Sequence, residues 1–289
     1  MSEAIDWLSP VVAAAERANP PADGDYLDDE GLLVCGKCHT RRQKIIQIPG
    51  AVSTERHELK VMVQCRCRRE ADEAQKRRWQ MEKEMDAVKS LKAKSLMDDR
   101  LVGAVFSSFQ VTRHNAQNLK LCRRYAERFE EMMRKNQGLL FYGNVGTGKT
   151  YAAACIANFL LERRTSVVMT SFVKLLDTMQ KTRDDDQILI GRLNQARLLI
   201  IDDLGAERGT EYALEKVYDI IDSRYRARLP IILTTNLTLE EMKRATDTRY
   251  ARIYDRIFEL CYPVMFAGPS WRKVAANRRF EEMKTFLEG

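Results

Sequence analysis

The chain has 289 residues, 45% of them hydrophobic and 31% charged, and its formal net charge is +7. This composition is typical of a soluble globular protein, and no apolar run reaches the roughly 18 residues that a membrane span needs. The opening sequence MSEAIDWLSP has neither a basic start nor an apolar stretch. We therefore expect no secretory signal, a cytoplasmic location and no membrane partner.

The charge is divided unevenly along the chain. Residues 1–34 carry eight acidic side chains and one basic one, whereas residues 35–100 carry 17 basic and 10 acidic ones. An acidic beginning before a basic body indicates a polyanionic partner, such as nucleic acid. A charged surface that only faces water would give the same composition, so the charge alone does not decide between the two.

The first predicted elements belong to a small domain, residues 1–67, which begins with the acidic segment. Residues 9–18 predict a short helix, and residues 44–50 and 57–65 predict short strands around a turn at Pro49 and Gly50. Four of the seven cysteines lie in this domain, in the sequences CGKC and CRC: Cys35, Cys38, Cys65 and Cys67. Clustered cysteines in a protein kept reduced favour a metal site over disulfides.

Four thiolates at this spacing suit one tetrahedral Zn²⁺, and so small a domain lacks a core without a metal. An iron–sulfur cluster would also accept four thiolates, and His39 or His57 could replace a cysteine. The remaining cysteines have no such spacing, so we expect them in the core: Cys122, Cys155 and Cys261.

Residues 68–100 contain neither Gly nor Pro and are rich in good helix formers, which predicts a long exposed helix that links two domains. In the second domain, residues 101–289, apolar strands alternate with helices. We expect strands at residues 138–143, 166–170, 197–202 and 230–236, and helices at residues 115–136, 151–164, 172–180 and 211–227. This alternation predicts an α/β domain with a parallel sheet covered on both faces.

The sequence GNVGTGKT has the spacing of a phosphate-binding loop between a strand and a helix. Glycines let backbone N–H groups approach phosphate closely, and the start of the helix adds further N–H groups. Lys149 would reach the β- and γ-phosphates, and the Thr150 hydroxyl would bind Mg²⁺. The expected nucleotide site comprises Gly143, Asn144, Val145, Gly146, Thr147, Gly148, Lys149, Thr150 and Tyr151.

Two later strands end in polar residues that would lie beside this loop in a parallel sheet. Asp202, after the apolar run LLIID, would hold Mg²⁺, and Asp203 would polarise the attacking water. Asn236 closes the strand PIILTTN, where its amide could bind both the water and the γ-phosphate. The order of the three signals favours a catalytic site over unrelated turn residues.

Arginines follow in the sequence RIYDRIFELC, where Arg252 and Arg256 lie one helical turn apart on one face. Neither has an obvious route to its own phosphate site, so a guanidinium there could act on the γ-phosphate of a neighbouring subunit. Arg272, in the sequence SWRK, could sense the γ-phosphate of its own chain. A solvated charged face is the alternative for each arginine taken alone.

Together, LLFYGNVGTGKTYAAACIANFLL, LLIIDDLG, IILTTN and RIYDRIFELC…SWR resemble the AAA+ ATPases of the DnaC/DnaI helicase-loader family, close to the IstB-type transposition ATPases. The resemblance covers residues 101–289. It implies an ATPase that binds the hexameric replicative helicase, loads it onto single-stranded DNA and self-associates in the ATP state. It also implies that Arg256 is the arginine finger, with Arg252 beside it, that Arg272 is the second sensor, and that Phe106 and Phe109 flank the adenine.

Two alternatives stay open. One is an IstB-type regulator of transposition that binds duplex DNA under the control of ATP, and the other is a zinc-containing interaction protein that binds ATP without hydrolysing it. Many motor members of the superfamily place Glu where this chain has Asp203, and the shorter side chain predicts slow, switch-like hydrolysis.

Two further surfaces could touch DNA. Phe172, Lys174 and Lys181 fall in a segment that helps line a DNA path in loaders and initiators, although an ordinary crossover helix would have the same charges. In helicase loaders the N-terminal domain docks on the helicase. We expect that role first for residues 1–67, and DNA contact through Arg41, Arg42 and Lys44 second.

Overall fold

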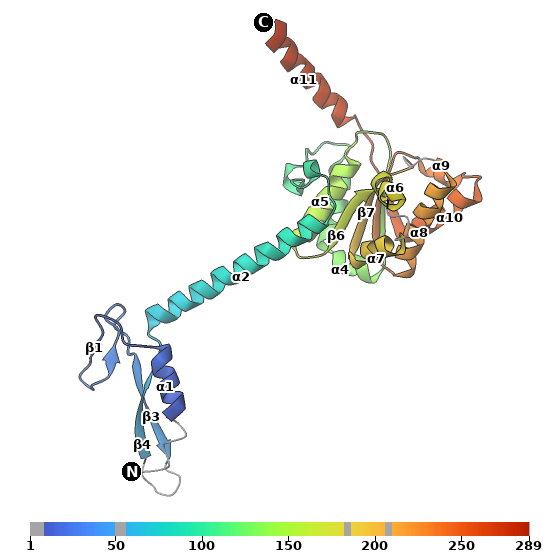
Figure 1. The fold of residues 1–289 in the computed structure, drawn as a ribbon. Coiled ribbons are helices and arrows are strands. Elements are labelled where there is room, and N and C mark those ends of the chain that lie inside the picture. Colours follow the sequence, from blue (N-terminus) through green and yellow to red (C-terminus); the bar gives the residue numbers. More distant parts are fainter. Residues whose placement is uncertain (1–8, 50–55, 182–185, 206–209, 289) are drawn as a thin grey trace. The chain divides into compact units, whose positions relative to one another are not determined.

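The computed structural model describes residues 9–49, 56–181, 186–205 and 210–288 (Figure 1). The chain divides into two compact units, Met1–Glu84 and Met85–Gly289. Among the described residues, none of the helices combines the length and the apolar composition that a bilayer crossing requires.

The first unit contains a short helix and two small antiparallel ladders. Helix α1 spans Ser9–Ala18, strand β1 (Tyr26–Leu27) pairs with β2 (Leu33–Val34), and β3 (Gln43–Pro49) pairs with β4 (Arg56–Met62). The predicted helix and the strand pair are confirmed, while Gly50 of the predicted turn lies outside the described residues. The described apolar side chains that are buried here are few, namely Leu32, Val34, Cys35, Met62 and Cys65, so apolar burial contributes little to this unit.

Helix α2 (Arg66–Lys94) follows, and the prediction of a long exposed helix is confirmed, since none of its described residues is buried. It ends at Lys94, six residues before the predicted end. The chain then turns and forms the short 3-10 helix η2 (Asp99–Leu101). The side chain of Asp98 accepts a hydrogen bond from the backbone N–H of Arg100 and caps the start of η2.

The second unit contains a five-stranded sheet in the order β6, β7, β8, β5, β9, and its paired strands are parallel. Figure 1 labels β6 and β7 of this sheet. The strands are β5 (Gly138–Tyr142), β6 (Val167–Ser171), β7 (Leu198–Leu204), β8 (Ile231–Thr235) and β9 (Cys261–Met265). The sequence predicted the first four and missed β9, which contains Pro263. A proline is tolerated there because β9 is an edge strand that pairs with β5 alone.

The helices of this unit are α3 (Ala116–Glu127), α4 (Phe129–Arg134), α5 (Lys149–Glu162), α6 (Phe172–Lys181), α7 (Asp186–Gln195), α8 (Glu211–Arg226), α9 (Leu239–Lys243), α10 (Thr248–Leu260) and α11 (Trp271–Glu288). The single helix predicted over residues 115–136 is divided at Arg128. Helices α7, α9 and α11 were not predicted.

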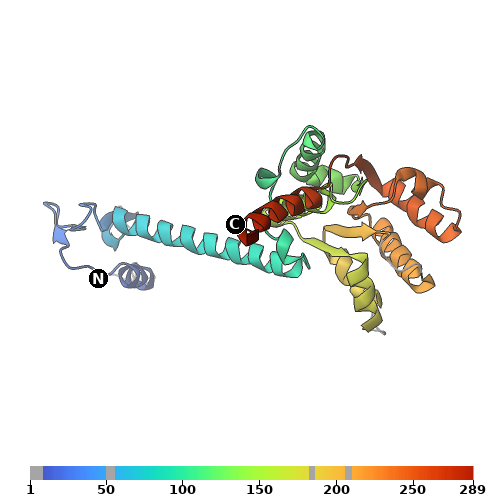
Figure 2. The same ribbon diagram turned by 90° about the horizontal axis from the view of Figure 1, so that it is seen from above.

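Two hydrophobic clusters cover the two faces of the sheet. Leu139 and Phe141 of β5 pack with α3, α4 and α5, whereas Leu140 packs with residues of α6, α7, α8 and α10. Figure 2 shows the green helices of the first layer and the yellow and orange helices of the second on opposite sides of the sheet. The three isolated cysteines are buried in these clusters. The predicted α/β domain with both faces covered is confirmed.

Candidate nucleotide-binding and metal sites

The phosphate-binding loop has backbone conformations that favour glycine. Gly143 has φ +123° and Gly146 has φ +81°, both in the region that L-residues rarely adopt. A Cβ atom at Gly143 would lie 2.4 Å from the carbonyl oxygen of Phe266, and one at Gly146 would lie 2.1 Å from Oγ of Ser270. Glycine at these two positions therefore allows the loop to pack against the segment that precedes α11.

Lys149, the first residue of α5, is 5% exposed and its ammonium is fully engaged. Nζ donates to the carbonyl oxygens of Gly143 at 2.7 Å and Asn144 at 2.8 Å, and to Oδ1 of Asn236 at 2.9 Å. Burial lowers the pKa of Lys149, and the carboxylates of Asp203 and Asp202 oppose that shift. The structure thus brings the lysine of the loop onto the amide at the end of β8.

Thr150 and Asp202 meet where α5 begins and β7 nears its end. The Thr150 hydroxyl lies 2.8 Å from Oδ1 and 3.1 Å from Oδ2 of Asp202, and the Thr234 hydroxyl also donates to Oδ1. Burial raises the pKa of Asp202 and the charge of Asp203 adds to that shift, while both hydroxyl donors oppose it. A hydroxyl beside a carboxylate offers the oxygen ligands that Mg²⁺ prefers.

Asp203 has a strained backbone, with φ +56° in the left-handed region. The pairing of β7 with β8 shifts register between Ile201 and Leu204, and the backbone N–H of Asp203 donates to Oγ1 of Thr234 at 3.0 Å. This irregularity places two successive acidic residues on the same cavity, which a regular strand with alternating side chains would not do.

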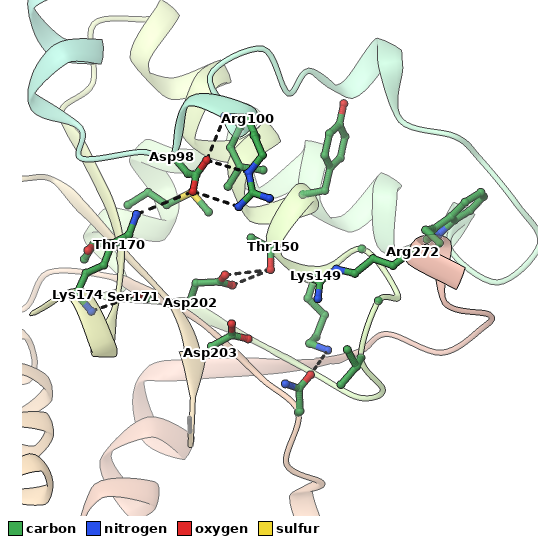
Figure 3. Close-up of a pocket in the computed structure, with 18 of the residues that line it drawn as sticks. Asp98, Arg100, Lys149, Thr150, Thr170, Ser171, Lys174, Asp202, Asp203 and Arg272 are labelled. Atoms are coloured by element: carbon green, nitrogen blue, oxygen red, sulfur yellow. Dashed lines mark hydrogen bonds and ion pairs between the residues drawn. The ribbon is translucent and has the colours of Figure 1, made fainter. Parts of the chain in front are cut away.

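A cavity of about 520 Å³ connects these groups (Figure 3). The predicted residues that line it are Val145, Gly146, Gly148, Lys149, Thr150, Tyr151, Asp202, Asp203, Asn236 and Arg272. The other predicted loop residues, Gly143, Asn144 and Thr147, do not line the cavity, and the buried Thr147 hydroxyl donates to the carbonyl oxygen of Asn144 at 2.8 Å. The backbone N–H of Trp271 donates to the carbonyl oxygen of Gly146 at 2.9 Å, so the loop also holds the start of α11.

Sequence reasoning missed one wall of the cavity, which is formed by residues 95–101. The carbonyl oxygen of Ser95 accepts a hydrogen bond from Met169 N–H of the edge strand β6 at 2.7 Å. Asp98 and Arg100 then line the cavity opposite the loop, with Lys174 of α6 4.0 Å from Asp98 (Figure 3). The only local signal was the helix-capping pattern of Asp98, which was hidden because residues 68–100 were interpreted as one helix.

The two phenylalanines expected beside the adenine, Phe106 and Phe109, have different neighbours. Phe109 lines a second cavity of about 450 Å³ with Tyr151 and Trp271, which also line the first one. Its ring centroid is 5.6 Å from that of Tyr151. Phe106 instead packs on Phe159, with ring centroids 5.9 Å apart, and lines neither cavity.

The structure does not bring Arg252 and Arg256 to the cavity of their own chain. Both lie on α10, where Arg252 is exposed and Arg256 is partly buried. Nε of Arg256 donates to Oδ1 of Asp222 at 2.8 Å. Phe172, proposed as a DNA contact, is fully buried in the core and cannot fill that role, whereas Lys174 and Lys181 are exposed.

In the first unit, the Sγ atoms of Cys35, Cys38, Cys65 and Cys67 all lie within 4.8 Å of one another. Those of Cys35 and Cys67 are 3.7 Å apart, and those of Cys65 and Cys67 are 3.4 Å apart. Four sulfurs on one tetrahedral Zn²⁺ would be separated by about 3.8 Å, given Zn–S bonds of about 2.3 Å. The arrangement therefore fits one ion.

The neighbours of this cluster correct two predictions. Arg42 is 3% exposed and forms an ion pair with Asp25, so it holds the domain together and is not available to DNA. Nδ1 of His39 lies 3.2 Å from the hydroxyl of Tyr26, and His39 is not part of the sulfur cluster. The side chain of His57, the other proposed substitute, lies outside the described residues.

Comparison with known proteins gives the family. The model of the family described as IstB-like ATP binding protein matches residues 60–278. The chain is 32% identical over 161 residues to the phage-like element PBSX protein XkdC of Bacillus subtilis, covering 52% of this chain and 57% of the relative. It is 31% identical over 154 residues to the replicative helicase loader DnaI of Bacillus subtilis, covering 48% of each.

The replicative helicase loader DnaC of Escherichia coli is 29% identical over 149 residues, covering 50% of this chain and 60% of the relative. The chain thus spans about half the length of the curated relatives it matches. Among solved structures, a crystal structure of DnaI covers 59% of this chain and 95% of its own, with a TM-score of 0.52 and 24% identity. One of the DnaC helicase loader covers 59% and 100%, with a TM-score of 0.50 and 21% identity.

These likenesses confirm the α/β fold expected for the AAA+ class. With a family model that matches about three quarters of its length, the chain belongs to the IstB-like ATP binding proteins.

Proposed function

We propose that this protein is an ATPase that binds a hexameric replicative helicase and loads it onto single-stranded DNA. The observation that carries the proposal is the convergence of Lys149, Thr150, Asp202 and Asn236 on one cavity. The chain in which this occurs has relatives that are named replicative helicase loaders. Because DNA and its helicase are the proposed partners, we propose a cytoplasmic location.

For ATP hydrolysis, the loop amides and Lys149 hold the β- and γ-phosphates. Thr150 and Asp202 supply the oxygens for Mg²⁺, which neutralises charge on the phosphates. Asp203 orients the attacking water, and Asn236 and Arg272 contact the γ-phosphate. Since the Asp203 side chain is one methylene shorter than Glu, it holds the water less closely, and we expect slow turnover that suits a switch.

Arg256, with Arg252 beside it, acts on the triphosphate of a neighbouring copy. Two observations support this assignment: neither arginine lines the cavity of its own chain, and both lie on a single helix, α10. An arginine supplied from outside neutralises the charge that develops on the γ-phosphate. The proposal therefore includes self-association of the chain in its ATP state.

The four-cysteine cluster holds Zn²⁺ and stabilises the N-terminal domain, residues 1–67, which docks on the helicase. Sulfurs bound to one tetrahedral Zn²⁺ lie about 3.8 Å apart. The separations of 3.7 Å between Cys35 and Cys67 and 3.4 Å between Cys65 and Cys67 are close to this value, whereas the ligands of a cluster of several irons are spread more widely. Residues 68–100 link this domain to the ATPase domain, residues 101–289.

Single-stranded DNA would contact α6, where Lys174 and Lys181 are exposed. Exposed lysines bind phosphate without reading sequence, which suits a protein that must act at any loading site. In the N-terminal domain, Arg41 is engaged with Asp28 and Glu30, which leaves Lys44 as the stronger candidate for a secondary DNA contact there.

The test is the retention of a hexameric helicase on circular single-stranded DNA, with ATP, in the presence of wild type, Lys149→Ala or Lys284→Ala. Lys284 is exposed on α11 and serves as the matched control. We expect retention with wild type and the control and none with Lys149→Ala.

If wild type retains no helicase but binds duplex DNA when ATP is added, a transposition-type regulator replaces the loader. If the chain binds ATP but releases no phosphate in the presence of single-stranded DNA, the proposed ATPase activity is wrong.

A further inference from the structure

Asp222 of α8 lies between two arginines. Its Oδ1 accepts a hydrogen bond from Nε of Arg256 at 2.8 Å, and its Oδ2 lies 2.8 Å from Nε of Arg226. The side chain of Asp222 is 11% exposed, that of Arg256 is 25% exposed and that of Arg226 is 76% exposed. The carboxylate is thus shielded from water, and each of its oxygens is assigned to a different guanidinium.

Two aromatic rings complete the surroundings of Arg256. Its guanidinium carbon lies 4.8 Å from the ring centroid of Tyr218 and 5.8 Å from that of Tyr225. The Tyr225 hydroxyl donates to Oε1 of Glu259 at 2.9 Å, and Glu259 lies on the same helix as Arg256. The rings of α8 and the carboxylate therefore fix the guanidinium relative to both helices.

The contact with Asp222 uses the inner nitrogen of Arg256. Within the part of the chain that the structure describes, neither terminal nitrogen of Arg256 donates a hydrogen bond. A carboxylate often binds both Nε and a terminal nitrogen of one arginine. Here Arg226 occupies the second oxygen, which leaves the terminal nitrogens of Arg256 available to a ligand.

Arg252 provides the contrast. It is exposed, and no hydrogen bond or ion pair within the described residues holds its guanidinium. A free arginine side chain loses about 2 kcal/mol of rotamer entropy when it is fixed on a ligand. A side chain that is already held avoids much of that loss, and preset charges stabilise a transition state without rearrangement.

We propose that Asp222 is the positioning residue for Arg256, holding Nε so that the terminal nitrogens meet the γ-phosphate bound by a neighbouring copy. This inference rests on the proposed function, in which Arg256 acts on another chain. Asp222 itself touches neither the nucleotide nor the reacting atoms. It belongs to the chain that supplies the arginine, and this makes its effect separable from any role in the chain that hydrolyses ATP.

The experiment mixes two inactive variants. Lys149→Ala lacks the loop lysine but keeps the arginine, and Arg256→Ala binds ATP but lacks the arginine. Phosphate release in the mixture, measured with single-stranded DNA as the sole added partner, reports only active sites completed by the first variant for the second. Asp222→Ala is then added to one variant at a time, and Asp222→Asn, which keeps an oxygen acceptor, is tested beside it.

We expect Asp222→Ala to lower phosphate release by about 10-fold or more in the Lys149→Ala chain and by less than about 2-fold in the Arg256→Ala chain. Asp222→Asn should restore part of the loss. An equal fall in both chains would show a role in folding or assembly and overturn the positioning role. No effect in the Lys149→Ala chain would overturn it while leaving the arginine finger intact. If the two parent variants do not complement at all, Arg256 is not an arginine finger and Asp222 has no positioning role. Retention of the helicase by wild type would still support the proposed loader function.

Discussion

The hydroxyl of Thr150 lies within 3.1 Å of both carboxylate oxygens of Asp202, so the first turn of α5 is joined directly to the end of β7. Both side chains are partly buried, and burial raises the pKa of Asp202. The folded protein therefore holds a charged carboxylate at neutral pH at some cost in stability, and a bound cation would offset that cost.

Replacement of the Asp202 carboxylate by an amide should raise the stability of the nucleotide-free protein while lowering its activity. We expect Asp202→Asn to lower Mg²⁺-dependent phosphate release by about 100-fold or more, because the amide cannot balance the cation. The folded protein binds a proton on Asp202 over a pH range in which the unfolded chain has lost it, so the stability of wild type falls as the pH rises through that range. Without nucleotide or Mg²⁺, Asp202→Asn should melt at a higher temperature than wild type at pH 7.5.

The gap in melting temperature should shrink as the pH falls toward 4, since wild-type Asp202 then becomes neutral. Thermal unfolding at several pH values measures this. A variant that melts below wild type at every pH would contradict the view that the carboxylate is held at a cost.

Asn236 should matter for hydrolysis more than for nucleotide affinity. Its side chain accepts a hydrogen bond from Lys149, which keeps two carbonyl partners without it. We expect Asn236→Ala to reduce phosphate release by about 100-fold, as removal of a single polar group at the reacting phosphate does, with the Kd for ATP changed by less than about 3-fold. Asn118→Ala, which removes a hydrogen bond to Met265 away from the cavity, is the control. If the affinity for ATP and the rate of phosphate release fall by the same factor, Asn236 contributes to nucleotide binding alone.

Arg224 is a structural arginine in the core. It is fully buried, and its guanidinium donates to main-chain carbonyl oxygens of Leu193, Ala196, Arg197 and Pro230. Burial lowers its pKa to about 9. We expect Arg224→Met to reduce the free energy of unfolding in urea by about 2–4 kcal/mol, because buried carbonyls lose their donor. Arg226→Met, on the same helix but exposed, should change it by less than about 1 kcal/mol.

The cysteine cluster should hold one metal ion per chain. We expect the purified protein to contain stoichiometric zinc, and Cys35→Ser to release it and expose the first unit to protease. ATP binding should be unchanged, since the described residues that line the nucleotide cavity belong to the second unit. Cys122→Ser, a buried cysteine of the core, should keep the metal. If the purified protein instead contains iron and shows a visible absorption band, the four cysteines hold an iron–sulfur cluster and the zinc assignment is wrong.

The exposed lysines of α6 should contribute to the salt dependence of DNA binding. Each phosphate contact adds about 0.7 to the slope of log K against log salt for single strands. We expect Lys174→Ala combined with Lys181→Ala to weaken binding to oligothymidine and to lower that slope by about 1 to 1.5. A double variant at Lys273 and Lys284, both exposed on α11, is the control. An unchanged slope would remove α6 from the DNA path.

The parts of the site that could be predicted from the sequence are those that one segment determines by itself. The loop needs glycines at fixed spacing, and Asp202 and Asn236 follow apolar strands whose carboxyl ends meet at one edge of a parallel sheet. The sequence does not show in the same way which charged side chains are exposed. Arg42 and Arg224 look like surface residues in the sequence, yet both are buried, because Arg42 pairs with Asp25 and Arg224 donates to carbonyl oxygens of the earlier segment that includes Ala196.

The elements that sequence reasoning missed depend on tertiary contacts. Asp98 and Arg100 reach the cavity because Ser95 pairs with the edge strand β6, and no periodicity in residues 68–100 indicates this. Asp222 and Arg256 are 34 residues apart and meet only when α8 packs on α10. Local pattern thus predicts which groups bind phosphate, whereas packing decides which groups hold them in place.

The hydrogen bond from Trp271 N–H to Gly146 has a mechanical consequence. A change in the phosphate loop that shifts the Gly146 carbonyl while this bond is kept would move the first turn of α11, and Arg272 with it. Helix α11 has 18 residues and is therefore about 27 Å long, so a rotation of about 10° at Trp271 displaces its far end by about 5 Å. A difference of one phosphate group between two nucleotides would in this way be enlarged into a movement that a bound partner can detect.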